Sequence, residues 1–397
     1  MNNSNLRPSV KIINILSRLN IGGPSVHAIL LTKYINNNRY ESKLISGSLN
    51  TGEGDMSYLI ADYGIKHQLI KSLKREISLI DDLRAVKELY QLFRREKPQI
   101  VHTNQAKAGI VGRIAAWLAH VPIILHTYHG HVFSGYFSAR KSSLYIFIEH
   151  FIAFISTRIV VVSDMIKKDI CSVYKIAPEK KVSVIPLGFD LKGMESLDHY
   201  RGSFRKQFSI PPDKLIIGIV GRLTAIKNHD LFVDIANLLL QRVNNLHFLI
   251  IGDGELRTEI EQKLITLGIA ENVHFTGWVK EAAKMYADLD ILLLTSKNEG
   301  TPVTVIEAMY YKIPVISSNV GGLSDLIEDG KTGFLVNSLV AEDYIPDILK
   351  LLGSKQERNN IGESGHTFVA GKFTLDRLIR DMDELYTKLL IKKGIMC

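Results

Sequence analysis

Two glutamates, Glu299 and Glu307, stand eight positions apart at the start of an expected helix. An apolar run ends just before them, and a helical pattern begins at Val303. We expect Thr301 to cap this helix and Pro302 to occupy its first position, where a missing N–H costs nothing. The free N–H groups of a helix start bind anions. An anion between two carboxylates suggests a phosphate with hydroxyl-rich groups on both sides, as in a nucleotide sugar.

Two cations, Arg222 and Lys227, follow the expected strand Leu215–Val220, with Gly221 directly after that strand. An arginine can donate two parallel hydrogen bonds to phosphate oxygens, and a lysine adds a point charge. We therefore expect the pair to neutralise a leaving diphosphate. The alternative, that both are ordinary surface charges, is less favoured because both lie between a buried strand and a helix.

Three further loops follow expected strands and carry glycine or aromatic residues. Gly22 and Gly23 precede a helix expected from residue 25, and Gly252 follows a second-half strand. Glycine lets a backbone approach a phosphate closely, although each loop also fits a plain turn. Trp278 and Val279 offer an apolar wall for a nucleobase, or alternatively core packing.

Three histidines, His126, His129 and His131, fall within six residues after another expected strand. A zinc site is disfavoured because no cysteine lies nearby and a strand end cannot easily direct all three inward. We expect His126 to be structural. His129, beside Gly130, is the candidate to hydrogen-bond a sugar hydroxyl or a leaving phosphate.

Two Asp-x-Asp patterns are not expected to bind a metal. Residues 288–290 enter a strand at its amino end, which is the wrong end of a parallel sheet for a ligand. Residues 381–383 lie inside an expected helix. The predicted site therefore contains no metal.

The elements that must position these residues form two strand–helix series, which predict two doubly wound α/β domains. A chain of 397 residues is also too long for one ordinary core. We expect domains at residues 1–195 and 196–374, a linker at 192–213, and a helix in 375–397 that returns to the first domain. The expected strands are 11–16, 42–45, 99–102, 122–126, 158–162, 182–185, 215–220, 246–251, 273–275, 291–294 and 314–317.

Charge is uneven along the chain, since residues 1–200 hold 26 Lys and Arg against 16 Asp and Glu. A basic half suits anionic lipid, nucleic acid or a phosphorylated substrate, or serves solubility alone. Only two cysteines are present, which argues against a disulfide framework and fits a reducing compartment. With no signal peptide or spanning helix expected, we predict a cytoplasmic protein, peripheral on the inner face of the membrane.

Aromatic residues next to cations raise a membrane-contact hypothesis for the first domain. Exposed aromatic side chains with basic neighbours suit an anionic bilayer surface. The alternative is that the aromatic residues pack in a core and the charges form a solvated helix face. The residues concerned are Val132, Phe133, Tyr136, Phe137, Arg140 and Lys141, with the basic group Lys71, Lys74, Arg75, Arg84, Lys87, Arg94 and Arg95.

Nearly the whole chain resembles a retaining GT-B glycosyltransferase of family 4, the glycosyl transferases group 1. The motifs are GRLTAIKNHD, GDGEL, FTGW, EGTPVTVIEAM and SNVGGLSDLIEDGKTGFLV, and the spacing of Glu299 and Glu307 matches the family signature. The GHVFSGYF run resembles bacterial members that build surface polysaccharides, lipopolysaccharide or exopolysaccharide. The resemblance implies two Rossmann-like domains facing a cleft, the first on the acceptor side. It implies transfer from a UDP-hexose or UDP-N-acetylhexosamine to a lipid-linked, polyprenyl-carried or polysaccharide acceptor, without metal or cofactor.

The same resemblance implies a role for each site residue. Arg222 and Lys227 would hold the departing diphosphate, and Glu299 the transferred sugar. Glu307 would hold the ribose, and His129 would touch the sugar near the reacting carbon. The other implied donor-binding residues are Gly22, Gly23, Gly221, Gly252, Trp278, Val279, Gly300, Thr301, Pro302 and Val303. Many members have an aromatic residue or Gly-Leu where this chain has Thr-Pro, which leaves the donor sugar open.

Front-face substitution is the favoured mechanism, because no Asp or Glu in the first-domain motifs is an obvious nucleophile for double displacement. Other functions stay open as alternatives. A GT-B epimerase or phosphorylase shares the architecture. A basic nucleic-acid-binding protein would need a reader helix or basic strands interleaved with aromatic residues, so no nucleic-acid partner is expected. A dehydrogenase would need G-x-G-x-x-G, which opens neither domain.

Overall fold

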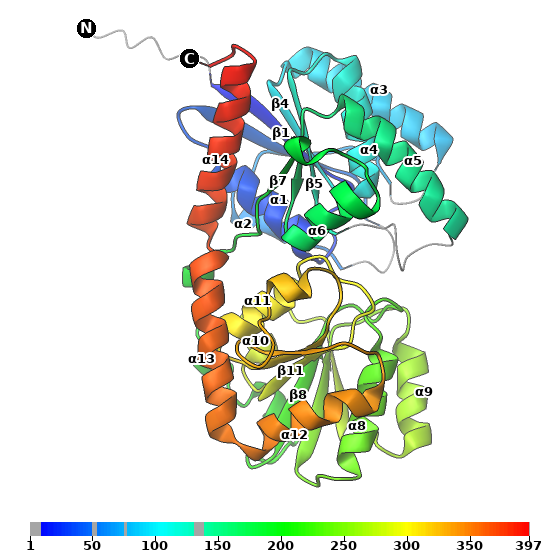
Figure 1. Cartoon of the computed structure of the whole chain (residues 1–397), viewed down its shortest axis with the longest axis vertical. Helices are drawn as coiled ribbons and strands as arrows, with labels where there is room; N and C mark the ends of the chain where they lie inside the picture. The colour runs from blue at the N-terminus through cyan, green and yellow to red at the C-terminus, as the bar shows by residue number, and fades with distance from the viewer. Residues whose placement is uncertain (1–8, 50–53, 75–77, 131–138, 397) are drawn as a thin grey trace, which may run out of the picture. The chain divides into compact units, whose positions relative to one another are not determined.

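The computed structural model describes residues 9–49, 54–74, 78–130 and 139–396, and it contains two compact units (Figure 1). Unit 1 combines Met1–Phe189 with Leu375–Cys397, and unit 2 is Asp190–Thr374. The boundary between them therefore falls six residues before the expected one. Each unit is built on a parallel sheet.

Unit 1 contains seven parallel strands in its described part, in the order β3-β2-β1-β4-β5-β6-β7. Their bounds are Val10–Leu16 (β1), Tyr40–Ser46 (β2), His67–Leu69 (β3), Ile100–Asn104 (β4), Ile123–Tyr128 (β5), Arg158–Val161 (β6) and Val182–Val184 (β7). From β1 the strands follow one another toward one edge of the sheet, and from β4 they follow one another toward the other edge, so the strand order reverses between β1 and β4. In such sheets ligands bind beyond the carboxyl ends of the strands at that point.

The helices of unit 1 cover both faces of its sheet (Figure 1). They are Gly23–Tyr34 (α1), Tyr58–Asp62 (α2), Leu79–Glu96 (α3), Ala106–Leu118 (α4), Ala139–Ile155 (α5), Asp164–Lys168 (α6) and Leu375–Lys392 (α14). α3, α4 and α5 lie on one side, and α1 and α14 on the other. Branched residues of the central strands, such as Ile13, Ile15 and Val101, fill the core under α3 and α4.

α14 closes unit 1 although it is far away in sequence. Leu378, Met382 and Leu390 are buried on its inner face. The hydroxyl of Tyr386 lies 2.8 Å from Nδ1 of His102 on β4. The polar residues of α14 lie between these apolar ones at helical spacing, so the sequence pattern alone predicts a packed helix here.

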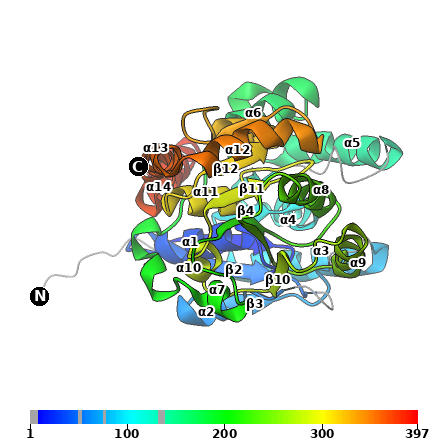
Figure 2. The same cartoon turned by 90° about the horizontal axis from the view of Figure 1, so that it is seen from below.

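Unit 2 contains six parallel strands in its described part, in the order β10-β9-β8-β11-β12-β13. They are Leu215–Val220 (β8), Leu246–Ile251 (β9), Val273–Gly277 (β10), Ile291–Leu294 (β11), Val315–Ser318 (β12) and Phe334–Val336 (β13). The helices are Ser203–Gln207 (α7), His229–Leu240 (α8), Arg257–Leu267 (α9), Ala282–Tyr286 (α10), Val303–Tyr310 (α11), Ile345–Gly353 (α12) and Lys355–Lys372 (α13). Figure 2 shows α8 and α9 on one side of this sheet and α10 and α11 on the other.

The prediction of a linker at residues 192–213 is wrong. The segment belongs to unit 2, where α7 forms and Phe204 is buried. The carboxylate of Asp288 accepts hydrogen bonds from the backbone N–H groups of Gly202 at 2.6 Å and Phe204 at 2.8 Å. A distant acidic residue thus caps the start of α7, and the local composition gave no sign of it.

In the part of the chain that the structure describes, no helix has both the length and the apolar character needed to cross a bilayer. Val132 and the aromatic residues Phe133, Tyr136 and Phe137 fall outside the described residues, as do Arg75 and the side chains of Arg140 and Lys141. That form of the membrane-contact hypothesis stays a prediction.

Candidate functional site

The loops that follow β8, β9 and β10 touch one another at the carboxyl edge of unit 2's sheet. The N–H of Gly221 donates to the carbonyl of Ile251 at 3.0 Å, and that of Gly252 donates to Gly277 at 3.0 Å. Gly252 has a φ of 136°, and a Cβ there would lie 2.1 Å from the carbonyl oxygen of Gly221. Glycine at 252 is therefore required for the loops to meet, independently of any ligand.

Lys227 and Glu299 meet at this edge from two different loops. Nζ of Lys227 lies 2.5 Å from Oε1 of Glu299, and the Ser296 hydroxyl donates to the same oxygen at 2.6 Å. The loops are held together by backbone bonds such as Lys297 N–H to the Ile226 carbonyl at 2.8 Å. The aliphatic part of the Lys227 side chain packs over Gly221, and its Cε lies 3.5 Å from the position that a Cβ of residue 221 would occupy. A cation and a carboxylate are thus held side by side.

Arg222 lies beside the same loop and contacts Glu255 at 3.3 Å. The Glu255 side chain is more than half exposed, and an ion pair of this kind contributes little free energy. Breaking this contact with Glu255 therefore costs little free energy.

The start of α11 differs from the expected one. Thr301 is not the cap; Pro302 occupies that position with φ −70° and ψ 118°. Proline at the N-cap position offers no side-chain acceptor to the first N–H groups of α11, and the buried hydroxyl of Thr301 has no partner among the described residues. The first turn of a helix leaves its N–H groups without intrahelical acceptors. α11 therefore begins with donors that an anion can use.

A glycine pair packs against the loop that carries Glu299. Gly321 has a φ of 56°, and a Cβ there would lie 1.8 Å from the Glu299 carbonyl oxygen. The N–H of Gly322 donates to the Gly300 carbonyl at 3.0 Å. These contacts fix the backbone between Glu299 and the start of α11.

Glu307, one turn inside α11, has a strongly perturbed carboxyl. Burial raises its pKa to about 7, and a hydrogen bond from the Tyr286 hydroxyl, 2.7 Å from Oε2, opposes that rise. The same hydroxyl lies 3.2 Å from the Thr304 carbonyl. Tyr286 was not among the predicted site residues. It lies on α10, and nothing in the local sequence links it to Glu307.

Trp278 follows β10, where Gly277 turns the chain with a φ of 69°. Its side chain is 40% exposed, so the core-packing alternative is wrong for this residue. Val279 is half-buried beside it. An exposed indole at the carboxyl edge of a sheet offers a flat surface on which a base can stack.

The histidines after β5 have different surroundings. His126 is buried and its Nδ1 lies 2.9 Å from the Thr103 hydroxyl. His129 lies beyond β5, where its Nε2 is 2.8 Å from Oδ1 of Asn104 at the end of β4. Its buried Nδ1 has no partner among the described residues. His131 lies outside them.

The His129 ring is neutral at physiological pH. Burial lowers its pKa well below the usual value, and the nearby His27 and His102 lower it further. The ring of His27, on α1, contacts that of His129 edge-on with centroids 4.9 Å apart. Neither His27 nor Asn104 was predicted as a site residue. The only sequence signal for Asn104 is its position at the end of a strand, which it shares with the predicted site residues.

Gly22 and Gly23 lie at the start of α1, which begins at Gly23 rather than residue 25. Gly22 has a φ of 153° and, among the described residues, no side chain caps the helix. The nearby turn is held by the Ser25 hydroxyl, which donates to the Asn20 carbonyl at 2.7 Å. In the described part of the chain, no group of three or more His, Cys, Asp or Glu side chains is arranged to hold a metal ion.

Comparison with known proteins gives matches over both halves of the chain. A family model described as "Glycosyl transferases group 1" matches residues 201–368, and one described as "Glycosyltransferase Family 4" matches residues 21–192. The chain is 30% identical over 339 residues to a UDP-Gal:alpha-D-GlcNAc-diphosphoundecaprenol alpha-1,3-galactosyltransferase of Escherichia coli, covering 84% of this chain and 86% of that protein. It is 28% identical over 323 residues to the capsular polysaccharide biosynthesis glycosyltransferase CapM of Staphylococcus aureus, covering 80% and 84%.

Solved structures share the fold at low sequence identity. HepE of Anabaena, crystallised with UDP and glucose, superposes with a TM-score of 0.82 at 18% identity over 96% of this chain and 100% of that one. A sucrose-phosphate synthase of Thermosynechococcus elongatus gives 0.82 at 20% identity, with the same coverage. The two-domain Rossmann-like architecture expected from the sequence is confirmed.

Proposed function

Because the chain belongs to the GT-B glycosyltransferases of family 4, and one bacterial relative is named for capsular polysaccharide biosynthesis, we propose a specific reaction for it. The enzyme transfers a hexose or N-acetylhexosamine from a UDP-sugar to a lipid-linked or polysaccharide acceptor, with retention at the anomeric carbon and without a metal. The observation that carries the proposal is the Lys227–Glu299 pair beside the start of α11, where a proline occupies the N-cap position.

The donor diphosphate is proposed to bind at the Lys227–Glu299 pair. Lys227 and Arg222 supply two positive charges, and the first N–H groups of α11, near Gly300 and Val303, supply donors. Glu299 accepts hydrogen bonds from sugar hydroxyls, a role that suits a nearly buried carboxylate already fixed by Ser296. Gly221 and Gly252 are proposed to contribute to donor binding by letting the loops after β8 and β9 pack closely beside this pair.

The nucleoside part of the donor is proposed to lie between α11 and the loop after β10. Glu307 would accept from the two ribose hydroxyls, and the base would stack near Trp278 and Val279. The choice of uridine is supported by relatives: the Escherichia coli relative is named for UDP-Gal, and HepE was crystallised with UDP-glucose.

Retention is proposed to proceed by front-face substitution. His129 contacts Asn104 and His27, and no carboxylate of the described residues hydrogen-bonds to it, so a double displacement has no evident nucleophile there. A non-bridging oxygen of the leaving diphosphate takes the acceptor proton while the acceptor oxygen bonds to the anomeric carbon. Arg222 and Lys227 stabilise the charge on the diphosphate as the glycosidic bond breaks.

His129 is proposed to orient the donor sugar. Because Nε2 faces the Asn104 carbonyl oxygen, this nitrogen donates and Nδ1 is left as an acceptor. A neutral imidazole with a free lone pair accepts from a sugar hydroxyl without adding charge near the reacting carbon. Gly22 and Gly23 are proposed to approach the diphosphate.

The acceptor is proposed to be carried on a polyprenyl lipid at an anionic membrane. The Escherichia coli relative is named for a diphosphoundecaprenol-linked sugar, and the basic first half of the chain suits such a surface.

A donor panel tests the proposal. Thermal-shift titrations with UDP-GlcNAc, UDP-GalNAc, UDP-Glc, UDP-Gal and GDP-Man should show stabilisation by one UDP-sugar above the others. Transfer from that donor to a polyprenyl-diphosphate sugar should give a product whose mass rises by one sugar and whose new linkage is α by NMR coupling.

An inverted product would overturn retention, and preference for GDP-Man would overturn the uridine assignment. Donor conversion that needs no acceptor would favour the epimerase alternative. Full turnover in excess chelator supports the metal-independent chemistry, and loss that a divalent cation restores contradicts it.

A further inference from the structure

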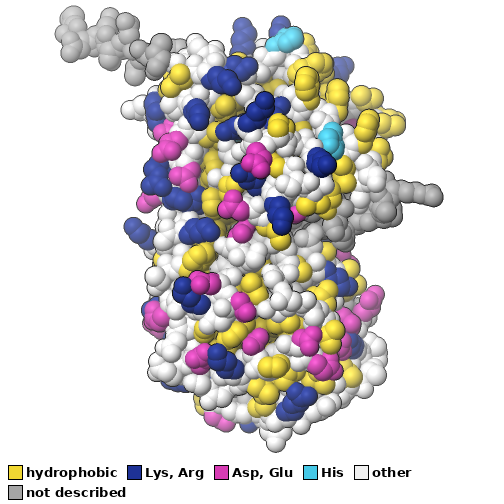
Figure 3. Space-filling view, viewed as in Figure 1, with side chains coloured by type: hydrophobic (Ala, Val, Ile, Leu, Met, Phe, Trp, Pro, Cys, Tyr) yellow, Lys and Arg dark blue, Asp and Glu magenta, His cyan; other side chains and the backbone are white. Residues whose placement is uncertain are grey.

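α5 exposes a stripe of large apolar side chains. Leu144, Phe147, Phe151 and Phe154 are between 59% and 82% exposed. Their spacing of three and four residues places them on one face of the helix. Figure 3 shows hydrophobic side chains gathered over this part of unit 1. A helix that faces water normally carries polar residues there, so this exposure needs an explanation.

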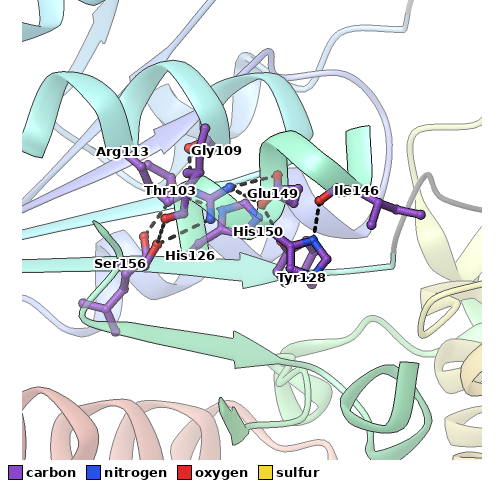
Figure 4. A network of polar contacts seen from close by, with 11 residues as sticks. Thr103, Gly109, Arg113, His126, Tyr128, Ile146, Glu149, His150 and Ser156 are labelled. Atoms are coloured by element: carbon purple, nitrogen blue, oxygen red, sulfur yellow. Dashed lines mark hydrogen bonds and ion pairs between the residues drawn. The ribbon is translucent and has the colours of Figure 1, made fainter. Parts of the chain in front are cut away.

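The opposite face of α5 buries a charged residue (Figure 4). Glu149 accepts two hydrogen bonds from Nη2 of Arg113 on α4, at 2.9 and 2.7 Å, and one from the Tyr128 hydroxyl at 2.6 Å. Arg113 is itself fully buried and donates from Nε to the Gly109 carbonyl at 2.6 Å. Breaking a buried ion pair is strongly unfavourable. The rotation of α5 about its axis is therefore fixed, and the phenylalanines cannot turn inward.

The start of α3 adds a second exposed apolar group on the same side of the sheet. Leu79, Ile80 and Leu83 are 65–79% exposed. Asp82 of α3 lies close enough to Tyr145 of α5 to contribute, after burial, to the raised pKa of that tyrosine. We call these three residues, with Leu144, Phe147, Phe151 and Phe154, the α3–α5 surface.

Charge around this surface is positive. From Lys97 to Ser163 the only carboxylate in the sequence is that of Glu149, which is buried against Arg113. Nζ of Lys181 donates to the Phe154 carbonyl at 3.0 Å, which places a cation at the end of the stripe. On α3, the Asp81 carboxylate is paired with Lys74 at 2.9 Å and that of Asp82 with Lys107, while Arg84, Lys87 and Glu88 are exposed.

We propose that the α3–α5 surface docks on an anionic lipid bilayer, with α5 lying in the plane of the interface. Apolar side chains rimmed by cations complement acyl chains below anionic headgroups. A second copy of this chain would bring the same cationic rim against itself. α3, α4 and α5 all begin at the carboxyl edge of unit 1's sheet, near His129, so docking brings that edge to the lipid. This last step rests on the proposed lipid-linked acceptor, whereas docking itself does not.

Vesicle flotation of the full chain tests the proposal. Wild-type protein should float with vesicles of phosphatidylglycerol and phosphatidylcholine in equal parts, and less with phosphatidylcholine alone. Replacing the rings in the triple variant Phe147→Ser, Phe151→Ser, Phe154→Ser should lower the partition coefficient at least about tenfold. The matched control replaces exposed apolar residues of unit 2, Ile265→Ser, Leu339→Ser and Val340→Ser, and should float like wild type.

Three outcomes overturn the proposal: no flotation of the wild type, equal flotation of the two variants, or a wild-type dimer in light scattering that the α5 variant dissociates. Folding of both variants is checked by circular dichroism, and single Phe154→Ser serves if the triple variant unfolds. Transfer to a short-chain, water-soluble acceptor should be unchanged in the α5 variant. A wild type that floats but transfers no sugar contradicts the proposed function and leaves docking supported.

Discussion

Glu307 is a carboxyl whose charge changes near neutral pH, because its pKa is about 7. If it holds the ribose, donor affinity should fall roughly tenfold as pH drops from about 8 to about 6, since a hydrogen bond to a carboxylate is stronger than one to a carboxylic acid. Calorimetric titration with the preferred UDP-sugar measures this, because the diphosphate of a nucleotide sugar has no proton to lose in that range.

Two variants make the pH experiment specific to Glu307. Glu307→Gln should bind more weakly and with little pH dependence. Tyr286→Phe removes a hydrogen bond that lowers the Glu307 pKa, so the midpoint should move to higher pH. An unchanged midpoint in Tyr286→Phe, or a persisting transition in Glu307→Gln, would assign the dependence to another group.

Burial of Glu307 also has a consequence for stability in the absence of donor. Its folded pKa lies above the usual 4.5, so the folded protein retains a proton that the unfolded chain has lost. This contribution is fully present below about pH 4.5 and is lost as pH rises through about 7. The thermal midpoint of Glu307→Gln should therefore depend less on pH across that window than that of the wild type.

Lys227 is the cation most closely coupled to Glu299. Lys227→Ala should lower kcat by roughly 10²–10³, as loss of a donor to a developing negative charge does. Lys331→Ala, an exposed lysine of the same unit, should stay within twofold of wild type. Near-full turnover in Lys227→Ala would refute its proposed role on the leaving diphosphate.

Substitutions of Glu299 and Glu307 should affect different steady-state kinetic constants. Glu307→Ala should mainly raise the donor KM, because ribose contacts act equally in the ground and transition states. Glu299→Ala should mainly lower kcat, because it orients the reacting sugar. The reverse pattern would exchange the two assignments.

Candidate site residues that directly follow a strand can be predicted from the sequence. Lys227 and Glu299 were selected separately, and the structure joins them at 2.5 Å. Hydrogen-bond partners of the site residues that come from other elements were not predicted. Tyr286 reaches Glu307 from another helix, and Asn104 reaches His129 from another strand. The expected Thr301 cap was wrong because propensity alone does not set where the first turn begins.

At the scale of elements, the buried pair between α4 and α5 makes a stability prediction. Arg113→Met leaves Glu149 buried without its cation and should lower the free energy of unfolding of unit 1 by about 3–5 kcal/mol. The chain has two tryptophans, Trp117 in unit 1 and Trp278 in unit 2. Urea unfolding followed by Trp117 fluorescence in a Trp278→Phe background therefore reports on unit 1 alone.

The control for this experiment is an exposed ion pair of the same unit. Lys66 pairs with Glu41 at 2.7 Å while largely exposed, so Lys66→Met should leave the free energy of unfolding close to that of the wild type. Equal losses in the two variants would show that the Arg113–Glu149 pair does not fix α5.

Long apolar strands were predicted within a few residues, because their side chains are buried on both faces. β8, β9 and β11 were placed to the residue. β3 and β13, each of three residues at a sheet edge, were missed, although β7, equally short and also at an edge, was predicted. The sequence around α7 predicts a linker because the carboxylate that holds this segment, Asp288, is distant in sequence.

At the scale of the whole molecule, unit 1 is discontinuous in sequence and unit 2 is not. A fragment of residues 190–374 should therefore fold alone and bind the UDP-sugar, although more weakly, as measured by circular dichroism and calorimetry. Residues 1–189 alone should not fold, because the core that α14 covers, with Leu378, Met382 and Tyr386, stays open.

A fusion provides the control. The N–H of Leu375 donates to the Phe189 carbonyl at 2.9 Å, so the two chain positions are adjacent. Joining residue 189 to residue 375 through a short Gly-Ser link should restore a folded unit 1 and, with it, vesicle flotation. A folded 1–189 fragment would contradict the role given to α14.

The position of α14 sets an order of events on the ribosome. Residues of unit 1 emerge first, but the helix that completes their core is translated only after all of unit 2. Unit 2 has everything it needs as soon as it emerges, so it should fold first although it comes second. Until then, the nascent first half presents unfinished apolar surface to chaperones. Chains terminated early thus lack both a finished first unit and, by our inference, the ability to reach the lipid.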